Sequence, residues 1–356
     1  MDIKENVNLS DHTSIGLGGT ASYFISCKSV DEITEALKFS SGKNLPVQIM
    51  SGGSNIVFPD SGFPGVVISV DIKGIIFKKI GNDIIAIAGA GESLDGLISE
   101  CIKNGYAGIE CLSGIPGSAG AAPVQNAGAY GQEIADVLEY VSVIDRSDLS
   151  FKKFTNPECG FSYRQSRFKK EDADKFIITE ICIRLSINNI SEIKFSGLKE
   201  RFSKIQDFEK TKDIKKKLNT IRNTVLEIRK EKSMVIDKSD ANSRSCGSFF
   251  MNPVLNENEF NEFKNMISKQ YPEFPFYKSG NEFKIPAAWL VERSGFEKGF
   301  VKNGVGISSN HSLALINISG TSAGLIQLSE VIQNAVKIRF GISLIPEPVI
   351  ILSSQY

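Results

Sequence analysis

Three short motifs contain side chains of the types that bind carboxylates or transfer protons in active sites. Arg164 follows Tyr163 in FSYRQSRF, and a guanidinium held beside a strand presents a fixed fork to a carboxylate or a flavin carbonyl. Ser248 precedes two phenylalanines in SCGSFFMNP, where its hydroxyl can be shielded from water. Glu347 stands between two prolines, which stiffen the backbone and would position a carboxylate. Each motif also has a purely structural explanation: an exposed arginine, a serine in a turn or helix cap, and a strand stopped by proline.

Two glycine-rich loops are suited to holding a phosphate-bearing cofactor. The longer, GIPGSAGAAPVQNAGAYG at 114–131, has little side-chain surface with which to build a core, and the shorter, SGGSN at 51–55, follows an apolar run. Glycine lets the backbone approach a ligand closely, and N–H groups in such turns bind phosphate oxygens. A structural turn is the alternative for each loop, although long loops in compact domains are often functional. Two such loops together favour a nucleotide cofactor.

Several classes of function are disfavoured. No GxGxxG motif follows a predicted strand, because Gly89-Ala90-Gly91 lacks the third glycine, so a Rossmann dinucleotide site is not expected. The 41 basic and 41 acidic side chains cancel, which gives no broad electrostatic footprint for nucleic acid or an anionic membrane. Six cysteines without a CxxC pair and only two histidines argue against a metal site and a disulfide framework.

The N-terminal segment is polar and does not resemble a secretory signal. No apolar run approaches the ~18 residues of a membrane span. We therefore expect a cytoplasmic protein with reduced thiols and no membrane insertion.

The elements that would position the motifs follow from the hydrophobic pattern. We expect a helix at 29–37, capped by Ser29 with Glu32 three residues later, and another at 93–104, ended by Gly105. The segment 190–232 is polar and lysine-rich and is predicted to be helical, and a closing helix is expected at 322–340. β-branched runs predict strands at 66–70, 84–91, 140–146 and 176–186, and a last strand in PEPVIILS that returns to an earlier sheet.

The predicted fold class is α+β. We expect a first subdomain at 1–68 with β-α-β order, to which a terminal strand within 342–356 returns, and a third domain at 231–341. The second subdomain, 69–230, is expected to be rich in antiparallel pairing, and the run 66–70 is read as part of this antiparallel pattern.

Five motifs in order, SGGSN, GIPGSAGAAPVQNAGAYG, YRQSRFK, GSFFMNP and PEP, resemble the UDP-N-acetylenolpyruvoylglucosamine reductase family in its longer type. The resemblance runs from about residue 8 over nearly the whole chain. It implies an FAD-binding fold of the vanillyl-alcohol-oxidase type in two subdomains, which lacks GxGxxG, and a C-terminal α/β domain that closes over a UDP-sugar. It also implies that NADPH and FAD reduce UDP-N-acetylglucosamine enolpyruvate to UDP-N-acetylmuramate for peptidoglycan synthesis.

The resemblance assigns three catalytic roles. Arg164 and Glu347 would polarise the substrate carboxylate while hydride passes from flavin N5 to C3, and Ser248 would protonate C2. Glu347 can help only as a hydrogen-bond donor, that is, in its protonated form, which burial favours. Serine is a weak acid, so Ser248 needs a water-poor site and a relay that replaces its proton.

The resemblance also implies binding residues. Those expected along FAD are Ser51, Gly52, Gly53, Ser54, Asn55, Pro116, Ser118, Asn126, Gly128, Tyr130 and Arg164. Those expected at the substrate or the NADPH phosphates are Tyr163, Lys232, Asn252 and Arg293.

This sequence departs from the family pattern in two places. Phe195 stands where the longer type often has a tyrosine over the diphosphate, and a phenyl ring cannot donate a hydrogen bond there. The segment 235–244 lengthens the approach to GSFF, and its role is open.

Two other classes of function stay open. A related FAD oxidase of alcohols or sugar lactones would share the flavin domains but lack GSFFMNP and the terminal PEP, and it often ties FAD to a histidine. Neither His12 nor His311 lies in the glycine loops. A catalytically inactive nucleotide-binding module would keep the loops and lose the acid or the carboxylate, whereas this chain retains all three candidates. We expect a monomer whose only partners are NADPH and the sugar nucleotide.

Overall fold

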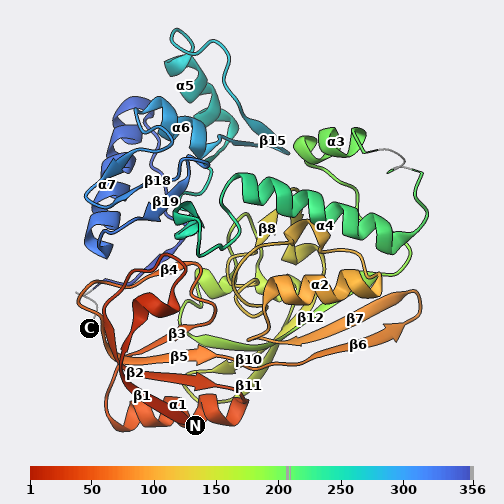
Figure 1. Cartoon of the computed structure of the whole chain (residues 1–356), viewed down its shortest axis with the longest axis vertical. Helices are drawn as coiled ribbons and strands as arrows, with labels where there is room; N and C mark the ends of the chain where they lie inside the picture. Colours follow the sequence, from red (N-terminus) through yellow and green to blue (C-terminus); the bar gives the residue numbers. More distant parts are fainter. Residues whose placement is uncertain (206–207, 209, 353–356) are drawn as a thin grey trace.

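The described part of the chain, residues 1–205, 208 and 210–352 of this computed structural model, is built on three main β-sheets with helices against them (Figure 1). The first two sheets lie together at one end of the molecule, and the C-terminal sheet lies beyond them with its own helices (Figure 1). The glycine loops lie between these parts of the structure. The described residues thus form a mixed α and β protein.

The first sheet has the order β1-β2-β5-β3 and carries helix α1. Its elements are β1 Asp2–Asn8, β2 Thr20–Cys27, α1 Val30–Gly42, β3 Val47–Met50 and β5 Phe63–Val70, with the short β4 Ile56–Val57 outside it. The predicted cap at Ser29 is confirmed, because its hydroxyl accepts from the N–H of Glu32, while the Glu32 carboxylate accepts from the N–H of Lys28. The helix runs five residues beyond the predicted end.

Strand β5 corrects one expectation. The run 66–70 was assigned to the antiparallel region, but β5 pairs in parallel with both β2 and β3. A buried β-branched run suits either kind of sheet, and only the crossover through α1 decides that β5 belongs to the first.

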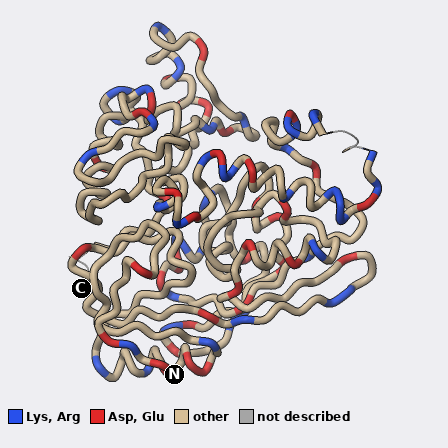
Figure 2. Tube along the Cα trace, viewed as in Figure 1, with Lys and Arg blue, Asp and Glu red and all other residues tan. Residues whose placement is uncertain are grey.

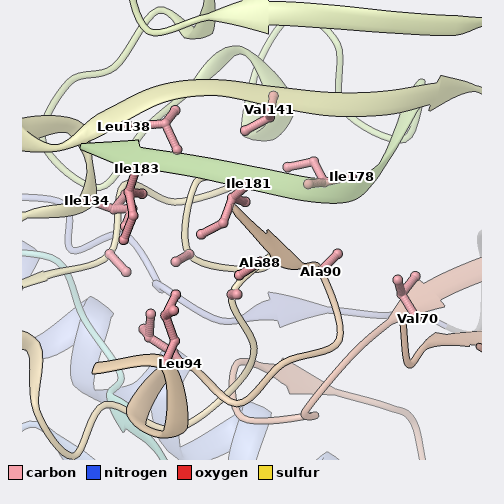
Figure 3. Packing of buried hydrophobic residues seen from close by; sticks show 14 of the residues in the cluster. Val70, Ala88, Ala90, Leu94, Ile134, Leu138, Val141, Ile178, Ile181 and Ile183 are labelled. Atoms are coloured by element: carbon pink, nitrogen blue, oxygen red, sulfur yellow. The ribbon is translucent and has the colours of Figure 1, made fainter. Parts of the chain in front are cut away.

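The second sheet is antiparallel, as predicted, with the order β11-β10-β12-β7-β6. Its strands are β6 Ile75–Ile80, β7 Asp83–Gly89, β10 Leu138–Asp145, β11 Phe151–Thr155 and β12 Phe176–Ser186. The edge strands β6 and β11 were not predicted, because their exposed lysines hide the alternating pattern. Helix α2, Leu94–Asn104, begins at the Ser93 cap and ends at Gly105 as predicted. Ile181 and Ile183 of β12 point from the sheet toward Leu94 of α2 (Figure 3).

The lysine-rich segment forms two helices, α3 Ser196–Ser203 and α4 Ile214–Glu231, as its pattern predicted. Helix α4 packs against α2 (Figure 1). It buries one face, Leu218, Ile221, Val225 and Ile228, and exposes Lys215, Lys216 and Lys230. Burying such an apolar stripe contributes roughly 1.5–3 kcal/mol per side chain.

The C-terminal part combines a four-stranded sheet, β13-β19-β18-β17, with a three-stranded one, β14-β16-β15. The elements are β13 Ser245–Ser248, β14 Val254–Leu255, α5 Glu257–Ile267, β15 Tyr277–Ser279, β16 Glu282–Lys284, α6 Ala287–Arg293, β17 Val301–Lys302, β18 Val305–Ile307, β19 Ala314–Asn317 and α7 Ser322–Phe340. Helix α7 matches the predicted range 322–340.

The chain then returns to its beginning. Strand β20, Val349–Ile350, pairs in parallel with β4. This confirms the predicted return of the C-terminal segment, while residues 353–356 of that segment lie outside the described residues.

The remaining regular structure consists of short pieces. The hairpin β8 Gly128–Ala129 and β9 Gln132–Glu133 lies in and just after the long glycine loop. The 3₁₀ helices are Leu9–His12, Glu110–Leu112, Ile134–Asp136, Pro157–Cys159, Arg167–Lys169 and Ala241–Ser243. Basic and acidic residues are interspersed along the trace (Figure 2). Within the described ranges, no helix combines the length and apolar character that crossing a bilayer requires.

Candidate active site

A cavity of about 460 Å³ lies where the two glycine loops meet the C-terminal segment. The short loop 51–55 forms one wall, the residues 115–118 and 120–122 of the long loop form another, and 346–349 border it. Of the expected cofactor residues, Ser51, Gly52, Gly53, Ser54, Asn55, Pro116 and Ser118 line this cavity. Glu347 also reaches it.

The two loops approach each other closely through their backbones, and the side-chain amide of Asn55 also donates to the side-chain oxygen of Gln125. A Cβ on Gly52 would lie 2.8 Å from the Cα of Gly117, which no side chain could tolerate without a shift. Gly53 has φ +59°, and a Cβ there would lie 1.9 Å from the carbonyl oxygen of His12. Glycine is therefore required at these positions, and the wall that the loops present is made largely of main chain.

Arg164 is fixed from three sides. Its Nε lies 3.5 Å from Oε1 of Glu347, and its guanidinium donates to the carbonyl oxygens of Asn126 and Gly128. Arg164 has φ +54°, a backbone conformation that is unfavourable for any residue other than glycine. Strain of this kind persists only where the surroundings hold it, and here it turns the guanidinium toward Glu347.

Asn126 is buried near the end of the long loop, and its side chain makes hydrogen bonds to three other parts of the protein. Its amide donates to Glu133 and to the carbonyl of Ser162, and its oxygen accepts from the N–H of Ala135. Its side chain thus joins the glycine loop to the turn that carries Arg164.

Ser248 ends strand β13 at a bulge. The pairing of β13 with β19 shifts register between Ser245 and Ser248, and Gly247 takes φ +73°. Such a bulge re-aims the side chain that follows it. Beyond it, the carbonyl of Phe249 accepts from the N–H of Glu347 at 2.8 Å. The structure thereby carries Ser248 and Glu347 on neighbouring segments, with Arg164 bonded to Glu347.

His311 is a functional candidate that the sequence reasoning missed. Its Nε2 lies 3.0 Å from Oγ of Ser248. Burial, followed by the nearby charges of Lys232, Lys298 and Arg229, lowers the pKa of His311 to about 4. The only sequence signal was that histidine is scarce in this chain, with two in 356 residues.

Lys169 is a second missed candidate. It lines the cavity, and its Nζ donates to the carbonyl of Glu347 at 3.0 Å. The pKa of Lys169 is lowered, chiefly by desolvation. The charge of Glu347 opposes this effect, and the charge of Arg164 adds to it. Its place at the end of YRQSRFK was the available signal.

Tyr163 and Asn252 meet at the junction with the C-terminal part. The ring of Tyr163 lies 3.5 Å from the Nζ of Lys284, and burial raises the pKa of its phenol. Oδ1 of Asn252 accepts from the N–H of Ala287 at the start of α6. Lys232 lies at the end of α4, where partial desolvation and then the charges of Lys298 and Arg229 lower its pKa.

Arg293 lies apart from these residues. It is exposed at the end of α6, with its guanidinium 6.0 Å from the ring of Tyr271. Among the described residues, no hydrogen bond or ion pair joins it to the other predicted site residues.

Tyr130 and Phe195 lie together beside the long loop, with ring centroids 5.3 Å apart in an edge contact. Burial raises the pKa of the Tyr130 phenol, which also bonds with Arg229. Phe195 therefore contacts the long glycine loop through the ring of Tyr130.

Comparisons with known proteins agree with this arrangement. A family model described as an FAD binding domain matches residues 21–148, and one described as the C-terminal domain of UDP-N-acetylenolpyruvoylglucosamine reductase matches 238–351. The chain is 38% identical over 353 residues to the UDP-N-acetylenolpyruvoylglucosamine reductase of Thermobifida fusca (strain YX), with 97% of each chain covered. It is 36% identical over 352 residues to the same enzyme of Amoebophilus asiaticus (strain 5a2), with 98% of each covered.

A solved structure shares the fold. The crystal structure of UDP-N-acetylenolpyruvylglucosamine reductase from Thermus caldophilus matches with a TM-score of 0.65 at 22% identity, over 98% of this chain and 99% of that one. Together with the family models, this confirms the predicted fold class, a flavin-binding fold followed by the C-terminal domain of the reductase.

Proposed function

Because the chain belongs to the UDP-N-acetylenolpyruvoylglucosamine reductase family, we propose that Arg164, Ser248 and Glu347 carry out the reduction of its enolpyruvyl sugar nucleotide. Family membership makes the protein an FAD-dependent oxidoreductase, a UDP-N-acetylmuramate dehydrogenase of peptidoglycan precursor synthesis. Beyond the family, we propose which residues act, and that NADPH is the source of the hydride. The observation that carries the proposal is the ion pair of Arg164 with Glu347 beside the segment that holds Ser248.

The residues at the cavity fit FAD. Gly52 and Gly117 let the two loops pack against each other, which brings main-chain N–H groups of both loops to the cavity, where such groups can bind a pyrophosphate. Ser51, Ser54 and Asn55 add polar groups to the short loop. When bound, FAD supplies a carrier that accepts hydride from NADPH and delivers it to C3 of the enol ether.

Arg164 binds the carboxylate of the substrate. Hydride addition at C3 places negative charge on C2 and the adjoining carboxylate, so a fixed guanidinium stabilises the transition state more than the ground state. The contacts to Asn126 and Gly128 hold the guanidinium in place before the substrate arrives, which avoids reorganisation during the reaction.

Glu347 acts on the substrate carboxylate as a hydrogen-bond donor. Two carboxylates beside one guanidinium repel each other unless a hydrogen bond joins them. Protonated Glu347 then donates a hydrogen bond to the substrate carboxylate and stabilises the charge that develops there.

Ser248 donates the proton that completes the reaction at C2. The O–H bond of Ser248 breaks as the C2–H bond forms, and water afterwards restores the hydroxyl. Tyr163, Lys232 and Asn252 lie around this region and are proposed to bind the sugar nucleotide, with Lys232 toward its diphosphate. Arg293 is proposed to contact the phosphates of NADPH or of the substrate, which requires that an anion reach the end of α6.

The decisive experiment is an anaerobic two-step reaction. The purified yellow protein is mixed with NADPH and the loss of flavin absorbance is followed, and UDP-N-acetylglucosamine enolpyruvate is then added under argon. We expect rapid bleaching, then return of the colour with formation of UDP-N-acetylmuramate. If the flavin stays reduced until oxygen is admitted, the chain is an oxidase-like relative, and the roles of Ser248 and Glu347 are wrong.

A further inference from the structure

His311 lies against the hydroxyl of Ser248 because of how the C-terminal sheet is paired. Ser248 of β13 is opposite Ala314 of β19, and the turn that leads into β19 folds back so that Nε2 of His311 lies 3.0 Å from Oγ of Ser248. The N–H of Ala314 donates to the carbonyl of His311 within this turn. The contact joins residues 63 positions apart and, among the described residues, is the one side-chain hydrogen bond that the Ser248 hydroxyl makes.

The turn that carries His311 is tied at several points. Asn310 donates to the hydroxyl of Ser233 at the end of α4, and Ser312 donates to the carboxylate of Glu292 on α6. The N–H of Ser309 donates to Oδ1 of Asn242 at 2.9 Å. Asn242 belongs to the segment 235–244, whose role was open from the sequence. This segment therefore serves to hold the turn that places His311.

Burial, together with the charges around His311, keeps its imidazole neutral. Arg229 and Lys232 face it from the end of α4, and Lys298 faces it from the loop before β17. Burial and these cations lower its pKa to about 4, so the ring carries one proton at neutral pH. The same cations favour negative charge on a neighbouring oxygen, such as a serine alkoxide.

We propose that His311 is a positioning residue for the proton donor Ser248, with its Nε2–H donating a hydrogen bond to Oγ. This inference rests on the proposed function, because it presumes that Ser248 protonates C2. A donated hydrogen bond from His311 leaves the Ser248 hydroxyl proton free to point at the substrate instead of at the ring. It also stabilises the alkoxide that remains after the proton has moved to C2.

The proton count is complete without a second acid. Hydride adds to C3, the former double-bond electrons move to C2, the C2–H bond forms and the Ser248 O–H bond breaks. His311 keeps its proton throughout, and water returns a proton to Ser248. A charged His311 that passed its own proton to Ser248 would instead lose that role above pH 4, where the ring is neutral.

The test separates the two half-reactions in His311 variants of the full-length, FAD-loaded protein. His311→Leu removes the donor, and His311→Gln keeps an N–H donor that does not titrate. His12→Leu is the matched control, because His12 is the other histidine, is exposed and stacks on Phe24. Flavin reduction by NADPH reports on folding and cofactor binding, and flavin reoxidation by the enolpyruvyl substrate reports on proton delivery.

We expect H311L to slow reoxidation by about 100-fold, in the range typical of losing acid–base assistance, with flavin reduction within twofold of the parent. H311Q should recover most of the rate, with no dependence on pH between 5 and 8 beyond that of the parent. The solvent isotope effect on reoxidation should rise in H311L, because proton transfer becomes slower. Asn242→Ala should slow reoxidation several-fold through the loosened turn.

Three outcomes would overturn the inference. Reoxidation of H311L at the parental rate removes any role for the contact. H311Q as slow as H311L, together with a parental rate that falls as pH rises from 4, assigns His311 as a titrating relay instead. An unchanged isotope effect in a slowed H311L assigns a purely structural role. Failure of the proposed function is seen separately, since Ser248→Ala would then reoxidise at the parental rate.

Discussion

Glu347 is held by its main chain as well as by its carboxylate. Its N–H donates to Phe249 and its carbonyl accepts from Lys169, while its Oε1 pairs with Arg164. The residue is thus rigid before any ligand binds, which suits a group that must meet one carboxylate at one distance.

Changing Glu347 tests whether it acts as a hydrogen-bond donor. Glu347→Ala should slow flavin reoxidation by the enolpyruvyl substrate by about 100- to 1000-fold, and Glu347→Gln should recover part of this, because its amide can donate. Glu330→Gln, exposed on α7, is the control. Equal rates for the alanine and glutamine variants would contradict the donor role.

Lys169 places a positive charge at the wall of the cofactor cavity. A cation stabilises the reduced, more negative flavin, so Lys169→Met should lower the reduction potential of the bound flavin. At an effective dielectric constant of 20 and a separation of about 10 Å, the interaction is about 1–2 kcal/mol, or about 20–40 mV for two electrons. Lys170→Met, its exposed neighbour, should leave the potential unchanged. Anaerobic titration against a reference dye measures both, and equal potentials would mean that Lys169 does not face the redox-active ring.

The motifs, through the family resemblance, predict Arg164, Ser248 and Glu347 as catalytic residues. The structure places Arg164 in contact with Glu347 and puts Ser248 on the neighbouring segment. The motifs were not enough to find His311 or Lys169. The Ser248–His311 contact joins residues 63 positions apart, and the Lys169–Glu347 contact joins residues 178 apart. Neither contact produces a recognisable pattern in the sequence. The first depends on the register of β13 with β19, and the second depends on the return of the C-terminal segment to β4.

Helix α4 supports the long glycine loop from outside the cavity. Arg222 of α4 makes a bidentate pair with Asp95 of α2, and Asp95 also accepts from the N–H of Gly114, where the loop begins. Burial opposes ionisation of Asp95, but these hydrogen bonds outweigh it and hold its pKa below the ordinary 3.8. The lysine-rich segment therefore fixes one end of the loop.

The Asp95 pair makes stability depend on pH. Because the folded protein lowers the pKa of Asp95, the pair stabilises the fold above pH 4 and loses this effect as pH falls below it. Asp95→Asn should reduce the free energy of unfolding at pH 7 by about 1–2 kcal/mol, a value reduced for partial exposure, and its difference from the parent should be smaller at pH 3. Urea unfolding at both pH values measures this. Asp83→Asn, in the exposed pair with Arg184, is the control and should change stability by less than about 0.5 kcal/mol. An equal loss for Asp95→Asn at pH 7 and pH 3 would contradict the assignment.

At the level of elements, helix ends were predictable because capping chemistry is local. Ser29, Ser93 and Gly105 occupy the positions that their types indicated. Sheet membership was less predictable. Strand β5 joined the parallel sheet and the edge strands β6 and β11 were missed, because partners and exposure are decided by distant parts of the chain.

The C-terminal part is joined to the N-terminal part because Asp60, which lies outside α7 in the sequence, caps the start of that helix. Both carboxylate oxygens of Asp60, between β4 and β5, accept from the N–H groups of Ser322 and Ala323 at the start of α7. Thr321 caps the same helix from within. Asn317 adds a buried bond to the carbonyl oxygens of Ile15 and Gly16. The substrate-side sheet is thereby fixed relative to the flavin-binding part.

The two caps can be separated by mutation. Asp60→Ala and Thr321→Ala should each lower the free energy of unfolding by about 0.5–2 kcal/mol, as lost helix caps do. Only Asp60→Ala should also weaken the attachment of α7 to the first part, seen as faster limited proteolysis around 60 and 322 under native conditions. If Thr321→Ala alone destabilises the protein, the contacts of Asp60 add nothing to the attachment.

Because the chain returns to β4 only at its C-terminal end, residues that contact each other in the folded protein are synthesised at very different times. Asn55 and Glu347, which bond to each other across the finished molecule, are 292 positions apart. At about 5–20 residues per second, a ribosome needs about 15–60 s to make the intervening chain. During that interval the nascent chain contains both glycine loops but lacks Glu347, and β4 lacks its partner strand β20. A chain that ends before residue 346 lacks both the strand that pairs with β4 and the segment 346–349 that borders the cavity.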